Sequence, residues 1–244
     1  MGFEMAINLS KSNYELIGYD IIQSKYDTLE INNIKCVTTI DEALSNPDVI
    51  ITMLPDGKIV KKVWGKIFSM LKTKPLVIDC STIDINNAKE FHMLANQSNI
   101  KSLDAPVSGG VIGAKNGSLT FMVGGNKDDY DKAKPLFDIM GNKSVLCGSA
   151  TSGQAVKICN NMLLAVTMVG VSEAFNLAES LNINQQKLFD VISTSSGSCW
   201  AVNNYCPVKG IGPNSPADND FTAGFASNLM HKDLSLAIAA ATET

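Results

Sequence analysis

The chain has 244 residues, 45% of them hydrophobic and 18% charged, and its formal net charge is −4 at pH 7. This composition is that of a globular protein of one or two domains. The acidic balance and the lack of any basic run argue against nucleic acid or an anionic membrane as a partner. Six cysteines without CxxC spacing and only two histidines predict a reducing compartment and no metal site. We place His92 on an ordinary polar helix, which disfavours a histidine-centred acid–base pair.

The first twenty residues fit the second half of a dinucleotide-binding unit. Residues 1–9 predict a helix, and residues 15–20 predict a short apolar strand that ends on Asp20. In the G-x-G-x-x-G fingerprint the third glycine packs helix against strand, and an acid about 20 residues on binds the ribose hydroxyls. Gly2 and Asp20 fit these places, although a surface turn is the alternative for Asp20. The first strand and two glycines would precede Met1, so we expect a piece of a longer protein.

Apolar segments without alternation recur up to residue 148, with helical segments between them. This pattern predicts a largely parallel sheet covered on both faces. The predicted strands are 48–55, 76–82, 102–110, 119–125 and 144–148, and the predicted helices are 57–71, 86–97 and 128–140. Ligands of such sheets bind outside the carboxyl ends of the strands, where Pro55, Ser81, Thr82 and the Ser108–Gly110 segment fall. Simple turn chemistry is the alternative for each of these positions taken singly.

From residue 151 the pattern changes to helices alone. Residues 153–179 predict one long helix that is apolar on nearly every face, so we expect it to be buried rather than to span a membrane. Shorter helices are predicted at 184–193 and from 229 to 244, with an irregular loop at 204–219. The sequence therefore predicts an α/β Rossmann-type parallel-sheet domain over residues 1–150, followed by an all-α domain over residues 151–244.

Two polar side chains stand near the start of the long apolar helix. Lys157 and Asn161 are four residues apart, so they share one helical face. A lysine is costly to bury as a cation, and burial can lower its pKa toward the range that a general base needs. The alternative is a lysine that extends its ammonium to solvent with an amide beside it.

Several motifs, in this order along the chain, resemble those of the β-hydroxyacid dehydrogenases. The motifs are Ile51–Pro55, Asp79–Ile83, Asp104–Gly110, Leu119–Gly125, Gly153–Asn161 and Leu229–Leu234. The resemblance covers essentially the whole chain, and Ser195–Trp200 with Asn204–Val208 resembles the branch that oxidises 3-hydroxyisobutyrate in valine catabolism. It implies hydride transfer from a small 3-hydroxy acid to NAD. A related 3-hydroxyacid dehydrogenase, a tartronate-semialdehyde or succinic-semialdehyde reductase, and a noncatalytic truncated member remain as alternatives.

The resemblance also implies roles for individual residues. Lys157 matches the catalytic general base and acid, and Asn161 matches the amide that positions it. The substrate-binding positions are Ser108, Gly109, Gly110 and Lys232, and the NAD-binding positions are Gly2, Asp20, Leu54, Pro55, Thr82 and Lys232. Asp20 stands where relatives that prefer NADP carry Arg, which predicts NAD.

The resemblance further implies helices after Thr244 and a homo-oligomer for the full-length protein. It predicts the mitochondrial matrix in a eukaryote, with a presequence upstream of Met1, or the cytoplasm in a bacterium.

Overall fold

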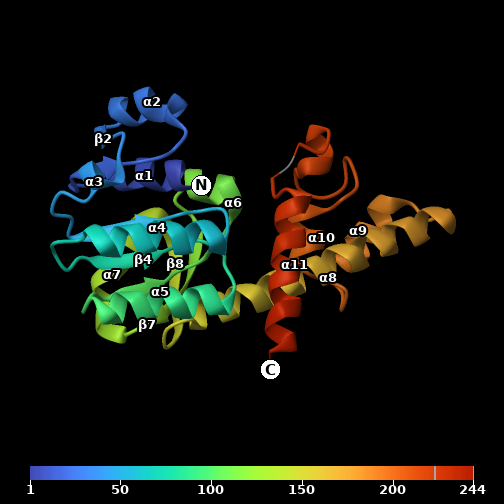
Figure 1. Cartoon of the computed structure of the whole chain (residues 1–244). Coiled ribbons are helices and arrows are strands. Elements are labelled where there is room, and N and C mark those ends of the chain that lie inside the picture. Colours follow the sequence, from blue (N-terminus) through green and yellow to red (C-terminus); the bar gives the residue numbers. More distant parts are fainter. Residues whose placement is uncertain (223, 244) are drawn as a thin grey trace. The chain divides into compact units, whose positions relative to one another are not determined.

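A computed structural model describes residues 1–222 and 224–243, with Lys25 described in its backbone only (Figure 1). The chain divides into two compact units, and each is described here by itself. The first unit is Met1–Lys157 with the last residues from Thr242, and the second is Ile158–Ala241. Helix α8 (Ser152–Ser180) begins in the first unit and continues in the second. Thr244, where the last helix is predicted to end, lies outside the described residues.

The first unit is built on a six-stranded sheet in the order β3-β4-β5-β7-β6, with β8 paired to β7. These strands are β3 (Val49–Thr52), β4 (Leu76–Asp79), β5 (Ser102–Asp104), β6 (Val107–Ser108), β7 (Leu119–Gly125) and β8 (Gly141–Gly148). The pairs β3–β4, β4–β5 and β7–β8 are parallel, as predicted, whereas β7 runs antiparallel to β5 and β6. The segment 102–110 forms two strands rather than one, because Pro106 has no N–H to continue the ladder.

A smaller sheet precedes the main one. Strands β1 (Leu16–Gly18) and β2 (Ile34–Cys36) pair in parallel, and α1 (Gly2–Ser10) precedes them, so the predicted first helix and strand are confirmed. The sequence analysis missed the short elements around β2: η1 (Gln23–Lys25), α2 (Tyr26–Ile31) and α3 (Ile40–Ala43). Elements of this length span too little chain for hydrophobic periodicity to show.

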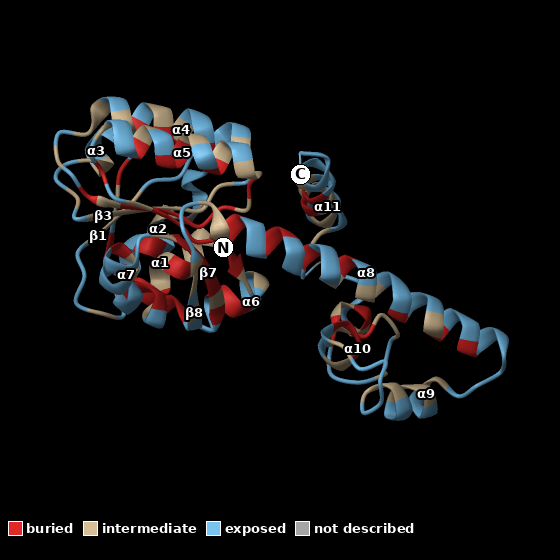
Figure 2. Ribbon diagram, turned by 90° about the horizontal axis from the view of Figure 1, so that it is seen from below, coloured by how far each residue is buried: buried red, intermediate tan, exposed pale blue. Residues whose placement is uncertain are grey.

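Helices cover both faces of the main sheet, as predicted (Figure 2). On one face α4 (Gly57–Met70) and α5 (Ile85–Gln97) bury Trp64 and Phe91 against the sheet residue Val77. On the other face α1 and α7 (Lys127–Met140) pack around Phe121 and Phe137. Short helix α6 (Gly110–Lys115) joins β6 to β7. The sheet thus lies between two separate apolar cores.

The second unit contains helices and no strand among its described residues. Besides α8 these are α9 (Gln185–Ile192), α10 (Trp200–Tyr205), the 3₁₀ turn η2 (Pro216–Asn219) and α11 (Ser227–Thr242). Val171 and Phe175 of α8 pack on Ala201 and Val202 of α10. The Asn184 side chain accepts a hydrogen bond from the Lys187 N–H and caps α9. The predicted irregular loop at 204–219 in fact begins within α10 and ends in η2.

The middle of α8 is exposed, so the prediction of a buried helix is wrong. Leu163, Val166 and Val169 are each more than 60% exposed. By length and composition α8 could cross a membrane, with a mean hydropathy of 1.4 over its most apolar window, but one such helix is weak evidence for that. An apolar sequence shows that a helix has a face to bury, but it does not show which segment covers that face.

Candidate active site

The loops that follow strands β3 and β4 are joined at one edge of the sheet. Parallel strands present their carboxyl ends at the same edge, and here the Leu54 N–H donates to Ser81 Oγ over 2.8 Å. The Ser81 hydroxyl in turn donates to Asp79 Oδ1 over 2.6 Å, and Thr52 Oγ1 donates to the same oxygen over 2.7 Å. The predicted cofactor positions Leu54, Pro55 and Thr82 are thus held on two loops that bond to each other.

Asp79 and Asp104 are buried neighbours in the sheet, at paired positions of β4 and β5. Burial raises the pKa of Asp79, and the negative charge of Asp104 raises it further. The hydrogen bonds from Ser81 and Thr52 act in the opposite direction and are the smaller effect. The environment of Asp79 therefore favours its neutral form more than water does.

The predicted substrate loop has a backbone conformation that requires glycine. Gly109 has φ of 132° and Gly110 has φ of 63°, both in the region that residues with a Cβ avoid. A Cβ on Gly109 would also lie 3.1 Å from Leu119 Cδ2. Ser108 pairs with Thr120 of β7, which fixes the loop on the sheet. The loop thus has a defined shape, and its Gly109 backbone is exposed.

Gly2 and Asp20 occupy positions that fit a dinucleotide. A Cβ on Gly2 would lie 3.3 Å from Met53 Cβ, so α1 approaches the segment after β3 closely, as the last fingerprint glycine allows. Asp20 follows β1 with its side chain exposed, and one carboxylate oxygen accepts from the Ile22 N–H over 2.9 Å. The Tyr26 hydroxyl donates to the Asp20 carbonyl over 2.7 Å and fixes this turn. The residues present therefore fit a bound dinucleotide.

The start of α8 is bonded to the loop after β4. The Gln154 side chain is fully buried; its Nε2 donates to the Ser81 carbonyl over 2.7 Å, and its Oε1 accepts from the Ile83 N–H over 3.1 Å. Lys157 follows in the next turn of the helix and is only 6% exposed. A side chain with so little exposure is not extended into solvent, which disfavours the alternative of a surface lysine.

In the second unit one carboxylate contacts two predicted site residues. Asn161 Nδ2 donates to Asp233 Oδ2, and Lys232 Nζ lies 3.2 Å from Asp233 Oδ1. The side-chain oxygen Oδ1 of Asn161 accepts from Asn160 Nδ2 over 3.0 Å. Since a carboxylate only accepts, the amide nitrogen of Asn161 must face it, and that nitrogen carries a second N–H. The sequence analysis missed Asp233, although it directly follows Lys232 in the matched motif.

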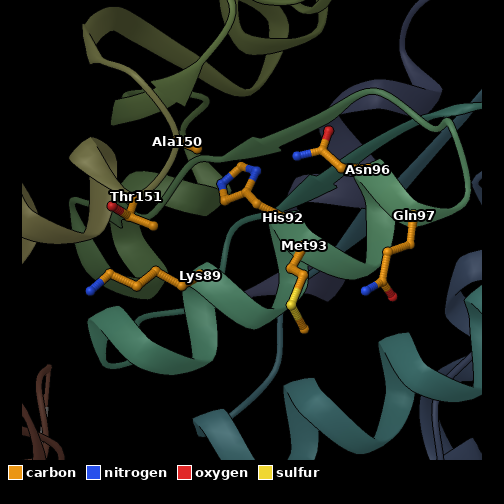
Figure 3. A pocket seen from close by; sticks show the side chains of 7 residues that line it. All are labelled: Lys89, His92, Met93, Asn96, Gln97, Ala150 and Thr151. Carbon is orange, nitrogen blue, oxygen red and sulfur yellow. The ribbon is translucent and has the colours of Figure 1, made fainter.

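The sequence analysis placed His92 on a helix correctly but was wrong to take its surroundings as those of an ordinary polar helix. His92 is buried on α5, with Nε2 2.9 Å from Asp104 Oδ1 and Nδ1 2.8 Å from Ser102 Oγ. A signal was present in the sequence, because Ala88, Phe91 and Ala95 share its helical face and are all buried. His92 forms part of a pocket of about 440 Å³ (Figure 3). The pocket is lined by Lys89, His92, Met93, Asn96, Gln97, Ala150 and Thr151.

Two sequence profiles match the chain end to end. The profile of the NAD binding domain of 6-phosphogluconate dehydrogenase matches residues 1–148. The profile described as NAD-binding of NADP-dependent 3-hydroxyisobutyrate dehydrogenase matches residues 151–244. A Rossmann-like NAD-binding domain followed by helices, with small residues at its strand ends, defines an NAD(P)-dependent oxidoreductase.

Known relatives match over nearly the whole chain. The solved structure of Mycobacterium tuberculosis 3-hydroxyisobutyrate dehydrogenase with L-serine is 43% identical, with a TM-score of 0.94 over 100% of this chain and 84% of that one. The NAD-dependent L-serine dehydrogenase of Pseudomonas aeruginosa is 39% identical over 99% of this chain and 82% of its own. The probable mitochondrial 3-hydroxyisobutyrate dehydrogenase of Dictyostelium discoideum is 40% identical over 98% and 75%. The chain belongs to the 3-hydroxyisobutyrate dehydrogenase family of NAD-dependent oxidoreductases.

Proposed function

We propose that this chain oxidises 3-hydroxyisobutyrate to methylmalonate semialdehyde with NAD, as a step of valine catabolism, with Lys157 as the general base. The observation that carries the proposal is the setting of Lys157. It is 6% exposed, on a helix whose first turn is bonded to the loop after β4. Sheets of this class bind their cofactors outside the carboxyl ends of the strands, so a proton acceptor anchored there stands where the chemistry takes place.

Bound NAD would supply the hydride acceptor for the carbon that bears the hydroxyl group. Lys157 in its neutral form accepts the hydroxyl proton as the hydride leaves, and it returns that proton in the reverse direction. The second N–H of the Asn161 amide hydrogen-bonds the substrate oxygen and keeps it aligned with the lysine. The N–H groups of the Ser108–Gly110 loop and the ammonium of Lys232 hold the substrate carboxylate.

We assign the cofactor to Gly2, Asp20, Leu54, Pro55 and Thr82, with Lys232 close to the nicotinamide and the substrate. The two joined loops after β3 and β4 support this assignment, as does the close approach of α1 at Gly2. A carboxylate at Asp20 hydrogen-bonds free ribose hydroxyls and repels a 2′-phosphate, so NAD is preferred over NADP.

A second candidate substrate is L-serine, which is also a 3-hydroxy carboxylate. The Pseudomonas relative is named for this activity, and the Mycobacterium structure contains L-serine. Initial rates of NADH formation should be compared for 3-hydroxyisobutyrate and L-serine, and rates of NADH consumption for tartronate and succinic semialdehydes. We expect the highest kcat/KM for 3-hydroxyisobutyrate. A higher value for another compound would reassign the substrate, and no turnover of any of them would favour a noncatalytic protein.

We further propose that the full-length protein is a homo-oligomer in which the apolar face of α8 is covered. The support is the exposure of Leu163, Val166 and Val169, since exposed apolar patches of this kind mark interaction surfaces. Sedimentation of the wild type and of Val166→Glu would test this, because the charge should weaken association. For the compartment we propose the mitochondrial matrix in a eukaryote, as the Dictyostelium relative's name suggests, and the cytoplasm in a bacterium.

A further inference from the structure

The carboxylate of Asp104 joins three elements of the first unit. Asp104 ends β5 and is buried. Its Oδ1 accepts from the Thr151 N–H over 2.8 Å, and its Oδ2 accepts from the Gln154 N–H over 2.9 Å. His92 Nε2, from α5, lies 2.9 Å from the same Oδ1. One side chain therefore bonds the start of α8 to the sheet, and an imidazole from the covering helix completes its set of partners.

The hydrogen-bond pattern places a proton on His92 Nε2. Both oxygens of Asp104 already accept backbone N–H groups, so the carboxylate acts as an acceptor throughout. The imidazole nitrogen that faces it must then donate. Ser102 Oγ, 2.8 Å from Nδ1, donates to that nitrogen when the ring is neutral and fixes this tautomer.

The backbones of α8 and β7 pack directly against the Asp104 carboxylate. A Cβ on Gly153 would lie 2.8 Å from Asp104 Oδ2, and a Cβ on Gly124 would lie 2.4 Å from Asp104 Oδ1. Glycine at both places lets the helix start and strand β7 close directly onto the carboxylate. A change in the position of Asp104 is therefore transmitted to the backbone of the first turn of α8.

We infer that His92 is a positioning residue for Lys157, acting through Asp104. Without the imidazole donor, Asp104 would be a buried carboxylate beside the buried Asp79, with one fewer partner. A carboxylate that has lost a donor gains by turning toward another one, and that movement weakens its hold on Thr151 and Gln154. Lys157 follows in the next turn, so its placement depends on this hold. The predicted effect on turnover rests on the proposed role of Lys157. The predicted effect on the start of α8 is independent of that role.

Amide hydrogen exchange measures how firmly the start of α8 is held by Asp104, and it does not require an active enzyme. In His92→Leu we expect exchange in the segment 150–157 to accelerate by about tenfold, as expected for the loss of one hydrogen bond. In His92→Gln, whose side-chain N–H can still donate to Asp104, exchange should return close to the wild-type rate. Met93→Leu is the matched control, because Met93 lies next to His92 on α5 and is 49% exposed. Ser102→Ala, a milder change, should accelerate the same segment by less, and it carries the test if His92→Leu does not fold.

Kinetics then tests the connection to the lysine. We expect His92→Leu to lower kcat by about tenfold with the KM for NAD unchanged, and His92→Gln to restore most of the loss. Unchanged exchange in segment 150–157, or acceleration spread evenly over the whole first unit, would overturn the inference. Local acceleration with an unchanged kcat would overturn the link to Lys157. A wild-type protein without turnover would instead refute the proposed function, and the exchange data would still decide whether His92 anchors α8.

Discussion

Replacing Gln154 with leucine should destabilise the first unit strongly. The variant keeps a side chain of similar size, but it removes the bond to the Ser81 carbonyl at 2.7 Å and the bond from the Ile83 N–H at 3.1 Å. Both bonds are buried, so each lost bond leaves a backbone group unpaired, at about 1–3 kcal/mol. The expected loss in the free energy of unfolding is therefore about 2–6 kcal/mol.

Urea unfolding followed by the fluorescence of Trp64 measures this loss, in a Trp200→Phe background that leaves a single tryptophan in the buried core of the first unit. Gln97→Leu is the control, because Gln97 is exposed at the end of α5 and its replacement should change stability by no more than about 0.5 kcal/mol. If Gln154→Leu unfolds at the same urea concentration as this control, the two bonds do not anchor α8.

Three further predictions concern the buried Asp79, the exposed Asp20 and the buried Cys80. Burial raises the pKa of Asp79 above its ordinary 3.8, so the folded chain binds a proton that the unfolded chain has lost. Stability should therefore fall as pH rises from near 3.8 through the raised pKa, and thermal unfolding of Asp79→Asn across this range should lack that fall. Asp20→Arg should lower the ratio of kcat/KM for NAD over NADP, and an unchanged ratio would refute the ribose assignment. Iodoacetamide should label Cys80 only after unfolding and not in the native protein, because this thiol is buried and burial raises its pKa; mass spectrometry detects the label.

The strands and the long helix could be predicted because their signals are local. Continuous apolar segments that end in small polar residues located β3 and β4, and an unbroken run of helix formers located α8. The glycine positions could also be predicted, since the backbone at Gly109 requires a residue without a Cβ. Lys157 could be selected as a candidate because a cation in an apolar helix is costly to bury, and that mismatch is visible in the sequence itself.

Contacts between distant segments could not be predicted in the same way. Asp104 accepts hydrogen bonds from Thr151 and Gln154, which lie 47 and 50 residues further along the chain. Asn161 donates to Asp233, which lies 72 residues further along. Hydrophobic periodicity carries no information about such long-range contacts. The role of Asp104 at the start of α8 and the contact of Asp233 with Asn161 were therefore both missed. The strand at 119–125 was predicted correctly, but its antiparallel direction was missed, since strand direction is set by the connection and not by the strand's own residues.

The central claim is that turnover depends on Lys157, and steady-state kinetics of Lys157→Ala tests it most directly. A general base contributes roughly 10²–10⁴-fold, so kcat should fall by about that factor while the affinity for NAD stays nearly unchanged. Lys157→Arg should not restore activity, because a guanidinium stays protonated. Asn161→Ala should lose less, and Lys187→Ala, at an exposed lysine of α9, should lose nothing. A wild-type kcat in Lys157→Ala would contradict the mechanism and make Lys232 the next residue to test.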